Sequence, residues 1–319
     1  DGGAVVCWSS PSITLNFQRV NPDGSLGASW LLTETGRAQS PSDMVRSGDD
    51  FILLWVRGEG TSFTSRKGLK IQKWTSAGVA QWNAGTAINV YTSAASPNKS
   101  IQSGYFPRLV TDGAGGAVVA WYDNGAARNA WVQHVNSDGT LRFTAGGIEG
   151  AAVSTTPAAT ELRLSAAVAF HADAGQYTVA FERSNPNQSQ FSVGAQRFDS
   201  DGDRLWGDGT GITIPTDNIN HASFINANDA HNDAIVTWLQ YGGANGPQSV
   251  LSALIDSGGN EIWTTSPLLV AADYGNKSRL QTTVSTSGDW LVAVWGDGAT
   301  GNSDVMANRI NFDGTLGGD

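Results

Sequence analysis

The residues best able to do acid–base or nucleophilic chemistry are spread thinly along this sequence. The four histidines are His134, His171, His221 and His231, and they fall at unrelated positions. A metal site or a nucleophile–base pair needs two or three such groups within hydrogen-bond reach. Because the spacing brings none of them together, we expect surface or turn histidines, no catalytic residue of this kind, no metal ion and no cofactor.

The run from Asp199 to Asp203 resembles a calcium-binding loop in its alternating carboxylates, but the position of its glycine argues against one. Alternating carboxylates can chelate a hard cation, but Gly202 comes too early for the helix–loop–helix calcium pattern. Asp23-Gly24 and Asp138-Gly139 stand in a similar context with fewer carboxylates. The run therefore predicts a hairpin turn.

Tryptophan provides the best positive case for a ligand. Trp74, Trp82 and Trp131 stand outside the apolar segments described below, and exposed indole rings can stack on sugar rings. Aromatic side chains on outer strands also seal neighbouring sheets against each other. We favour sealing.

An apolar segment that ends in a large aromatic residue recurs six times and must position whatever chemistry the chain has. The six aromatics are Trp8, Trp55, Trp121, Phe181, Trp238 and Trp295, spaced 47, 66, 60, 57 and 57 residues apart. A second strand follows each of them and runs into a glycine turn, usually Asp-Gly, which provides the positive φ of a tight hairpin. A third strand begins with an aromatic residue in most copies, and a fourth precedes the next apolar segment.

Four short antiparallel strands per repeat match the blade of a β-propeller, in which neighbouring blades cover both faces of the apolar strand. We predict an all-β fold, a single β-propeller of six four-stranded antiparallel blades with seven as the alternative, and the six aromatics at equivalent buried positions. The repeats run approximately over residues 1–38, 39–104, 105–160, 161–220, 221–277 and 278–319. The first repeat lacks its opening strand and the last its closing strand, which gives 22 strands and favours a chain that is part of a longer one.

The third repeat carries the clearest motifs. Gly115-Gly116 precedes Val119-Ala120-Trp121, and Gln133-His134 leads to Asp138-Gly139. This pattern resembles the repeat of secreted bacterial β-propeller proteins, whose blades have a Gly-Gly, Val-x-Trp, Gln-Arg, Asp-Gly consensus, and the resemblance covers nearly the whole chain. It implies a location outside the cytoplasm, either extracellular, at the cell surface or periplasmic. It implies no particular activity, because such folds host lectins, adhesins, assembly subunits, hydrolases and lyases.

Composition narrows the classes of partner. The formal charge is −10, from 19 basic and 29 acidic residues, and no run of Lys and Arg could neutralise phosphates, so we expect no nucleic-acid partner. No stretch approaches 18 consecutive apolar residues, so we expect no membrane insertion. Cys7 is the single cysteine and lies in an apolar segment, which predicts a buried small side chain.

The longest and most variable loops follow the apolar strands, at residues 57–68, 122–129, 182–190, 239–248 and 296–303. They share one edge of the blades, here called the long-loop rim, while the glycine turns share the other, the turn rim. The candidate ligand-binding residues on the long-loop rim are Arg57, Tyr122, Asp123, Arg183, Gln240, Tyr241 and Asp297. We expect segment 57–68 to lie beside Asp123 and to form a polar recess between the second and third blades.

The sequence favours a non-catalytic binding or assembly module that presents the long-loop rim to a protein partner or a glycan. One alternative is a polysaccharide hydrolase or lyase that uses rim residues such as Asp123, Arg183 and Glu182, because paired carboxyl groups can come from different blades. Glutamate is scarce, and the turns lack the Ser-x-Asp-x-Gly-x-x-Trp spacing of sialidase-type repeats, so the chain leans away from an enzyme. The other alternative is a structural subunit of a larger complex.

Overall fold

The computed structural model describes residues 2–10, 13–62, 64–92, 100–102, 104–124, 128–144, 150–155, 160–215, 221–241, 248–272, 276–298 and 304–317. The chain forms two compact units, Asp1–Ala126 with Val132–Ala151 and Ala127–Trp131 with Ala152–Asp319. The boundary between them falls within the two strands Ala130–Val135 and Ala151–Ala152. Each unit is described by itself.

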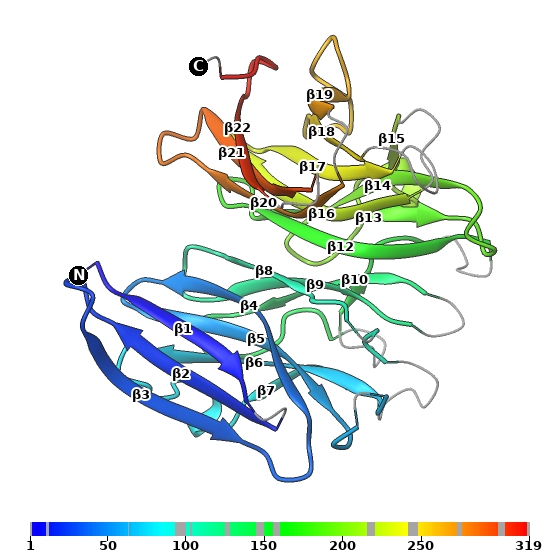
Figure 1. Ribbon diagram of the computed structural model, residues 1–319. Helices are drawn as coiled ribbons and strands as arrows, with labels where there is room; N and C mark the ends of the chain where they lie inside the picture. The colour runs from blue at the N-terminus through cyan, green and yellow to red at the C-terminus, as the bar shows by residue number, and fades with distance from the viewer. Residues whose placement is uncertain are drawn as a thin grey trace. The chain divides into compact units, whose positions relative to one another are not determined.

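The first unit holds three antiparallel meanders, seen in blue to green in Figure 1. Sheet 1 consists of β1 (Ala4–Ser9), β2 (Thr14–Val20) and β3 (Leu26–Thr33). Sheet 2 consists of β4 (Gln39–Ser47), β5 (Asp50–Gly58), β6 (Lys67–Thr75) and β7 (Ile88–Tyr91). Sheet 3 consists of β8 (Arg108–Thr111), β9 (Ala117–Tyr122), β10 (Ala130–Val135) and β11 (Ala151–Ala152).

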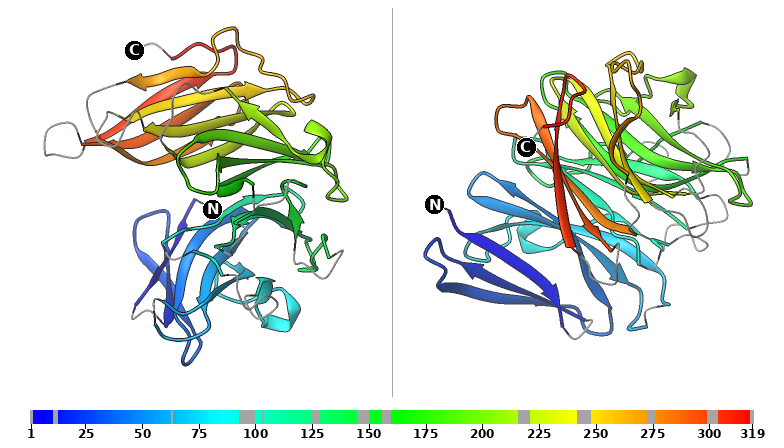
Figure 2. Two further views of the ribbon diagram at one scale, coloured as in Figure 1. Left: turned by 90° about the vertical axis from the view of Figure 1, so that its right-hand side faces the viewer. Right: turned by 45° about the horizontal axis from the view of Figure 1, so that its top comes forward.

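The second unit repeats this plan, and its sheets lie face to face in Figure 2. Sheet 4 consists of β12 (Leu162–His171), β13 (Gln176–Ser184), β14 (Phe191–Phe198) and β15 (Ile212–Ile214). Sheet 5 consists of β16 (His221–Ala230), β17 (Asp233–Tyr241), β18 (Gln248–Ile255) and β19 (Leu268–Ala272). Sheet 6 consists of β20 (Lys277–Val284), β21 (Trp290–Asp297) and β22 (Asp304–Asn311).

These sheets are the blades of a β-propeller fold, which confirms the predicted fold class. The described residues contain the 22 strands that the repeat predicts. Two of the six sheets have three strands, as the incomplete end repeats require, so a uniform set of four-stranded blades is corrected at sheets 1 and 6.

Five of the six repeated aromatics occupy the predicted buried position. Trp55, Trp121, Phe181, Trp238 and Trp295 are buried, whereas Trp8 is 44% exposed. On β1, Val5 and Cys7 pack into the cluster around Phe17 and Phe51. Because side chains alternate along a strand, Trp8 lies on the other face of sheet 1. The prediction is therefore wrong for Trp8.

The Gln-Arg and glycine motifs join the third strand of a sheet to its neighbours. The side chain of Gln196 bonds both backbone groups of Trp206, accepting from its N–H at 3.0 Å and donating to its carbonyl at 3.2 Å. The Trp206 indole then donates to Ser257 O in the turn of sheet 5 at 3.0 Å. Trp82 makes the same contact with Ser137 O in sheet 3, at 2.8 Å.

Glycine is required at these turns for two reasons. Gly139 has φ +87°, and a Cβ there would lie 2.9 Å from Cγ of Trp82. Trp74, Trp82 and Trp131 are all buried, which supports their role in sealing neighbouring sheets and removes them as an exposed sugar-stacking surface.

Candidate functional site

On the long-loop rim of the first unit, Arg57 is committed to an ion-pair cluster. Its Nε donates to the Glu34 carboxylate at 3.1 Å and its Nη1 lies 3.3 Å from Glu59 Oε2. Lys70 Nζ lies 3.5 Å from Glu34. The hydrogen bond from Arg57 lowers the pKa of Glu34. Arg57 therefore faces the segment after β3 and has carboxylate partners within its own unit.

Tyr122 ends β9, Asp123 follows it directly, and both residues are buried. The predicted approach of segment 57–68 to Asp123 occurs through residues 100–101. Lys67 N donates to Ser100 Oγ at 2.9 Å, and Asp123 forms a β-bridge with Ile101. The Tyr122 ring packs against Tyr105 at an interplanar angle of 51°, with 4.2 Å between the ring centroids. A recess does lie at this place, but its lining includes Val56, Lys67 and Phe106 instead of Arg57 and Asp123.

In the second unit, the first strands of the three sheets run in the same direction. His171 on β12 meets Asp229 on β16. Asn226 on β16 donates to Leu280 O on β20 at 3.3 Å, and two residues further on Thr282 donates to Asn228 at 2.6 Å. The beginnings of β12, β16 and β20 therefore share one rim. Because the pairing is antiparallel, the ends of β13, β17 and β21 lie on the same rim.

Glu161, which comes just before β12, binds two guanidinium groups on this rim. Its Oε2 lies 2.7 Å from Arg183 Nη2, and its Oε1 lies 3.0 Å from Arg163 Nη2. Arg163 and Arg183 face each other across the β12–β13 pair, and Arg163 is fully buried. The Glu161 side chain keeps 20% of its surface exposed. Burial lowers the pKa of Arg163, while Glu161 opposes that shift.

An open recess of about 410 Å³ lies beside this cluster. Its lining includes Thr160, Glu161, Arg183, Asn185, Gln190 and Phe191. The carboxylate, the guanidinium, the two amides and the aromatic ring belong to one sheet, because they come from β13, β14 and the segments beside them. These are the groups that hold a sugar through hydroxyl hydrogen bonds and ring stacking.

Glu182 does not contribute to the recess. It alternates with Arg183 on β13 and faces sheet 5, where its carboxylate accepts a hydrogen bond from Ala222 N at 2.6 Å. Its side chain is fully buried. Gln240 and Tyr241 end β17 on the same rim and are partly exposed, and Tyr241 OH lies 3.3 Å from Ser223 Oγ.

Asp297 ends β21 and pairs across the strands with Lys277. Its Oδ2 lies 2.8 Å from Lys277 Nζ, and the lysine side chain is fully buried. The second oxygen, Oδ1, is buried and has no hydrogen-bond partner among the described residues. Sequence reasoning found Arg183 and Asp297 but missed Glu161, Arg163 and Lys277, which are their partners on the neighbouring strand.

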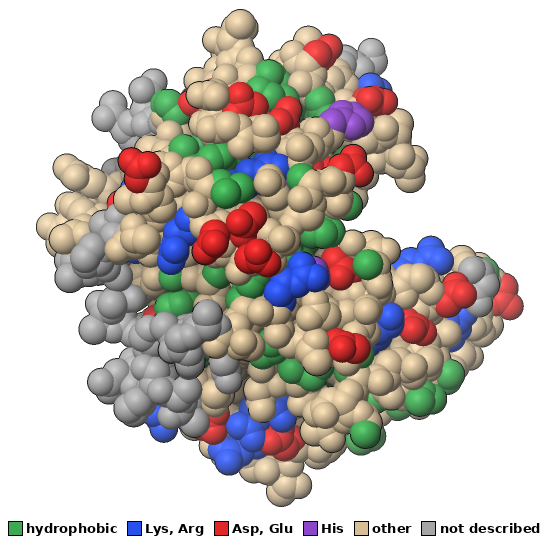
Figure 3. All heavy atoms as spheres, turned by 180° about the vertical axis from the view of Figure 1, so that it is seen from behind, with side chains coloured by type: hydrophobic (Ala, Val, Ile, Leu, Met, Phe, Trp, Pro, Cys, Tyr) green, Lys and Arg blue, Asp and Glu red, His purple; other side chains and the backbone are tan. Residues whose placement is uncertain are grey.

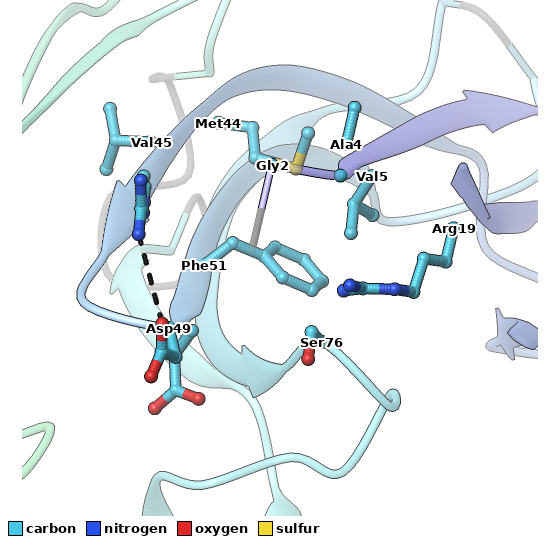
Figure 4. Close-up of a pocket in the computed structure, with 12 residues that line it drawn as sticks. Gly2, Ala4, Val5, Arg19, Met44, Val45, Asp49, Phe51 and Ser76 are labelled. Atoms are coloured by element: carbon cyan, nitrogen blue, oxygen red, sulfur yellow. Dashed lines mark ion pairs between the residues drawn. The ribbon is translucent and has the colours of Figure 1, made fainter. Parts of the chain in front are cut away.

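A different recess, of about 230 Å³, opens on the turn rim beside β1 and β4 (Figure 4). Figure 4 shows Arg19 and Phe51 pointing into it, with Asp49 paired to an arginine. That arginine is Arg46, whose Nη2 lies 3.9 Å from Asp49 Oδ1, and both side chains are largely exposed. A solvated ion pair of this kind is weak and holds no fixed geometry. We therefore place the candidate site on the long-loop rim.

The expectation of surface histidines is wrong at two positions. His134 and His171 are buried, while His231 is largely exposed. The side chain of His221 lies outside the described residues. His134 Nε2 lies 2.9 Å from Asp112 Oδ2. His171 contacts Asp229 through Nδ1 and Thr178 Oγ1 through Nε2, the latter at 2.8 Å.

The order Asp229, His171, Thr178 is that of a hydrolytic relay. Thr178 is fully buried in the middle of β13, so a substrate cannot reach its hydroxyl. Arg197 on β14 adds two hydrogen bonds to Asn232, both at 2.8 Å. The cluster therefore ties sheet 4 to sheet 5.

A pH effect is expected from His171. Burial lowers its pKa from the ordinary 6.5, and the hydrogen bond with Asp229 only partly opposes this. Below about pH 6.5 the unfolded chain takes up a proton more readily than the folded protein, so the free energy of unfolding falls as the pH drops toward the folded pKa. In urea unfolding between pH 7.5 and 5.5, we expect His171→Gln to have a shallower pH dependence than the wild type. His231→Gln is the matched control, and equal slopes for all three proteins would contradict this assignment.

The distribution of charged side chains bears on metal binding and on large basic surfaces. The residues that the structure covers contain no group of three or more His, Cys, Asp and Glu side chains placed to hold a metal ion. On the face seen in Figure 3, acidic and basic side chains are interspersed and form no large basic patch. No helix among the described elements is long and apolar enough to cross a membrane.

Comparison with known proteins yields similarity of structure alone. No protein-family model matches the chain, and no curated protein matches it. Among solved structures, it is similar to a Hadza microbial sialidase, with 11% identity and a TM-score of 0.51 over 97% of this chain and 66% of that one. It is also similar to a Penicillium chrysogenum α-L-arabinanase complexed with arabinobiose, at 14% identity and a TM-score of 0.47, over 97% of this chain and 90% of that one. A thermostable family-43 glycoside hydrolase follows at 13% identity and 0.46, over 88% of this chain and 92% of that one.

At these identities the likeness shows the propeller fold. All three neighbours are enzymes that cleave glycans, and this finding corrects the expectation of a non-catalytic binding or assembly module.

Proposed function

We propose that the chain hydrolyses glycosidic bonds of a polysaccharide on the long-loop rim of the second unit. The observation that carries the proposal is the Glu161 carboxylate, which two guanidinium groups orient at the edge of an open recess. Gln190 offers an amide to sugar hydroxyls there, and Phe191 offers a ring face. A glycan is accordingly the proposed partner.

Glycoside hydrolysis ordinarily uses two carboxyl groups that flank the scissile bond. Glu161 is the first in this proposal, and Asp297 is the second because it lies on the same rim of the same unit. Asp297 has Lys277 on one oxygen and a second oxygen without a partner among the described residues. Because that oxygen is buried, the proposal has Asp297 exchange protons through a water molecule and not by direct contact with the sugar.

The proposal keeps an extracellular, cell-surface or periplasmic location. It departs from the sequence-based hydrolase alternative in its residues. Glu182 is replaced by Glu161 because its carboxylate is occupied by the Ala222 amide, and Asp123 is replaced because it is buried in the other unit.

The test is a substrate screen with the purified chain. Arabinan, arabinobiose, β-1,3-galactan and sialylated glycans should be included, and released sugars measured by chromatography. We expect at least one glycan to yield shorter products, and the Glu161→Gln, Asp297→Asn double variant to yield none. A folded wild-type protein that releases nothing from any of these glycans would overturn the proposal.

A further inference from the structure

A small recess on the long-loop rim of the first unit is a candidate for a separate binding site. It encloses about 130 Å³ between the end of sheet 2 and the segment that leads into β8. The lining residues that matter are Ser40, Lys67, Gln102, Tyr105 and Phe106. All of them belong to the first unit.

Backbone hydrogen bonds fix the walls of the recess. Ala38 N donates to Gly60 O at 2.9 Å, and Gly58 N donates to Ala38 O at 2.7 Å. On the other side, Ile101 N donates to Lys67 O at 3.0 Å. The recess therefore exists before any ligand arrives, which lowers the entropic cost of binding.

Lys67 gives the recess its charge. The residue is 8% exposed, and burial lowers the pKa of its ammonium group. Its Nζ donates to Ser65 O at 2.9 Å. Among the described residues, no Asp or Glu lines the recess. An anionic group that enters meets a cation and no like charge.

Two aromatic rings form one side of the opening. Phe106 is 52% exposed, which is unusual for so large an apolar side chain. Tyr105, beside it, is braced by its contact with Tyr122, the buried end of β9. A sugar ring can lie against such rings while its substituents reach the polar wall, where Ser40 and Gln102 offer a hydroxyl and an amide.

We propose that this recess binds a sugar residue that carries a carboxylate, such as a uronic acid unit of a glycan chain. Lys67 binds the carboxylate, the Phe106 ring lies against the sugar face, and Gln102 and Ser40 bind hydroxyl groups. The site deepens the proposed function and rests on it only in that the ligand belongs to a glycan. The recess would select acidic glycans, although the protein itself carries a net negative charge.

The test uses monosaccharides, which contain no glycosidic bond to cleave. Galacturonate and galactose differ only at C6, which is a carboxylate in the first sugar and a hydroxymethyl group in the second. Binding of each to the full chain can be followed by NMR titration. We expect the wild type to bind galacturonate more tightly than galactose. Lys67→Met should lower the affinity for galacturonate about ten- to a hundredfold and leave galactose nearly unchanged, since a hydrogen-bonded charge is lost.

Matched variants separate charge from fold. Lys67→Arg should keep most of the affinity for galacturonate, and Phe106→Ala should weaken both sugars. Lys70→Met removes a lysine from the same strand, outside the recess, and should change neither affinity. Equal binding of the two sugars by the wild type, or unchanged galacturonate binding by Lys67→Met, would overturn the proposal. Neither result depends on whether the chain hydrolyses a polysaccharide at the second unit.

Discussion

Replacing Glu161 by glutamine is expected to lower kcat for glycan hydrolysis about 10²- to 10⁴-fold, the range over which a positioned acid or base contributes. The amide is nearly isosteric and still accepts a hydrogen bond from Arg183, but it can neither take up nor release the proton that hydrolysis requires. Steady-state rates on the glycan that the wild type cleaves would measure the effect. A thermal unfolding midpoint on the same sample separates loss of chemistry from loss of pairing with Arg163.

Two other carboxyl groups provide a companion variant and a control. Asp297→Asn should lower kcat by a similar factor, because it removes the second acid–base group. Asp201→Asn removes an exposed carboxylate from a turn of sheet 4 on the opposite rim and should leave kcat unchanged. A Glu161→Gln protein with wild-type kcat would exclude Glu161 from the chemistry.

The fold could be predicted in detail because each repeat contains its own apolar strand and turn glycine. The turn glycine has positive φ in all six copies, and in four of them a Cβ would also meet an indole ring, at Gly78, Gly139, Gly259 and Gly314. Strand number follows directly from the repeats. Trp8 was placed wrongly because its letters match those of Trp55, while burial depends on what covers that face of the sheet. No local pattern encodes the neighbour.

The candidate site could be predicted only in part. The position two residues beyond each repeated aromatic does lie on the long-loop rim, which is why Arg183 and Asp297 were found. What each side chain does there depends on its partner across the strand pair, and these partners come from distant segments. Glu161 and Lys277 precede strands whose register with β13 and β21 the sequence does not reveal. Their position just before or at the start of a strand opposite a charged rim residue is the signal that could have found them.

The buried histidine cluster shows the same limit. His171 and Asp229 belong to different repeats, 58 residues apart, and nothing in either repeat marks the other as a partner. Equivalent positions of neighbouring sheets do lie side by side, so a search for complementary polar residues at such positions would have paired them.

The largest effect on stability is expected from Trp238→Ala. Trp238 is fully buried between sheets 4 and 5, in a cluster that includes Ala180, Val193 and Leu251. Removing so large a ring should lower the free energy of unfolding by about 3–5 kcal/mol, the usual range for a buried Trp or Phe cut to Ala. Urea unfolding followed by circular dichroism would measure the loss.

Two companion variants show whether packing alone accounts for this loss. The indole N–H of Trp238 has no hydrogen-bond partner among the described residues, so Trp238→Phe removes an unsatisfied donor along with part of the ring and should cost clearly less than Trp238→Ala. Trp8→Ala, at the equivalent position of sheet 1, should also cost much less, because Trp8 is already 44% exposed. If Trp8→Ala destabilised the chain as much as Trp238→Ala, the exposed face assigned to sheet 1 would be wrong, and a partner surface would have to cover Trp8 in solution.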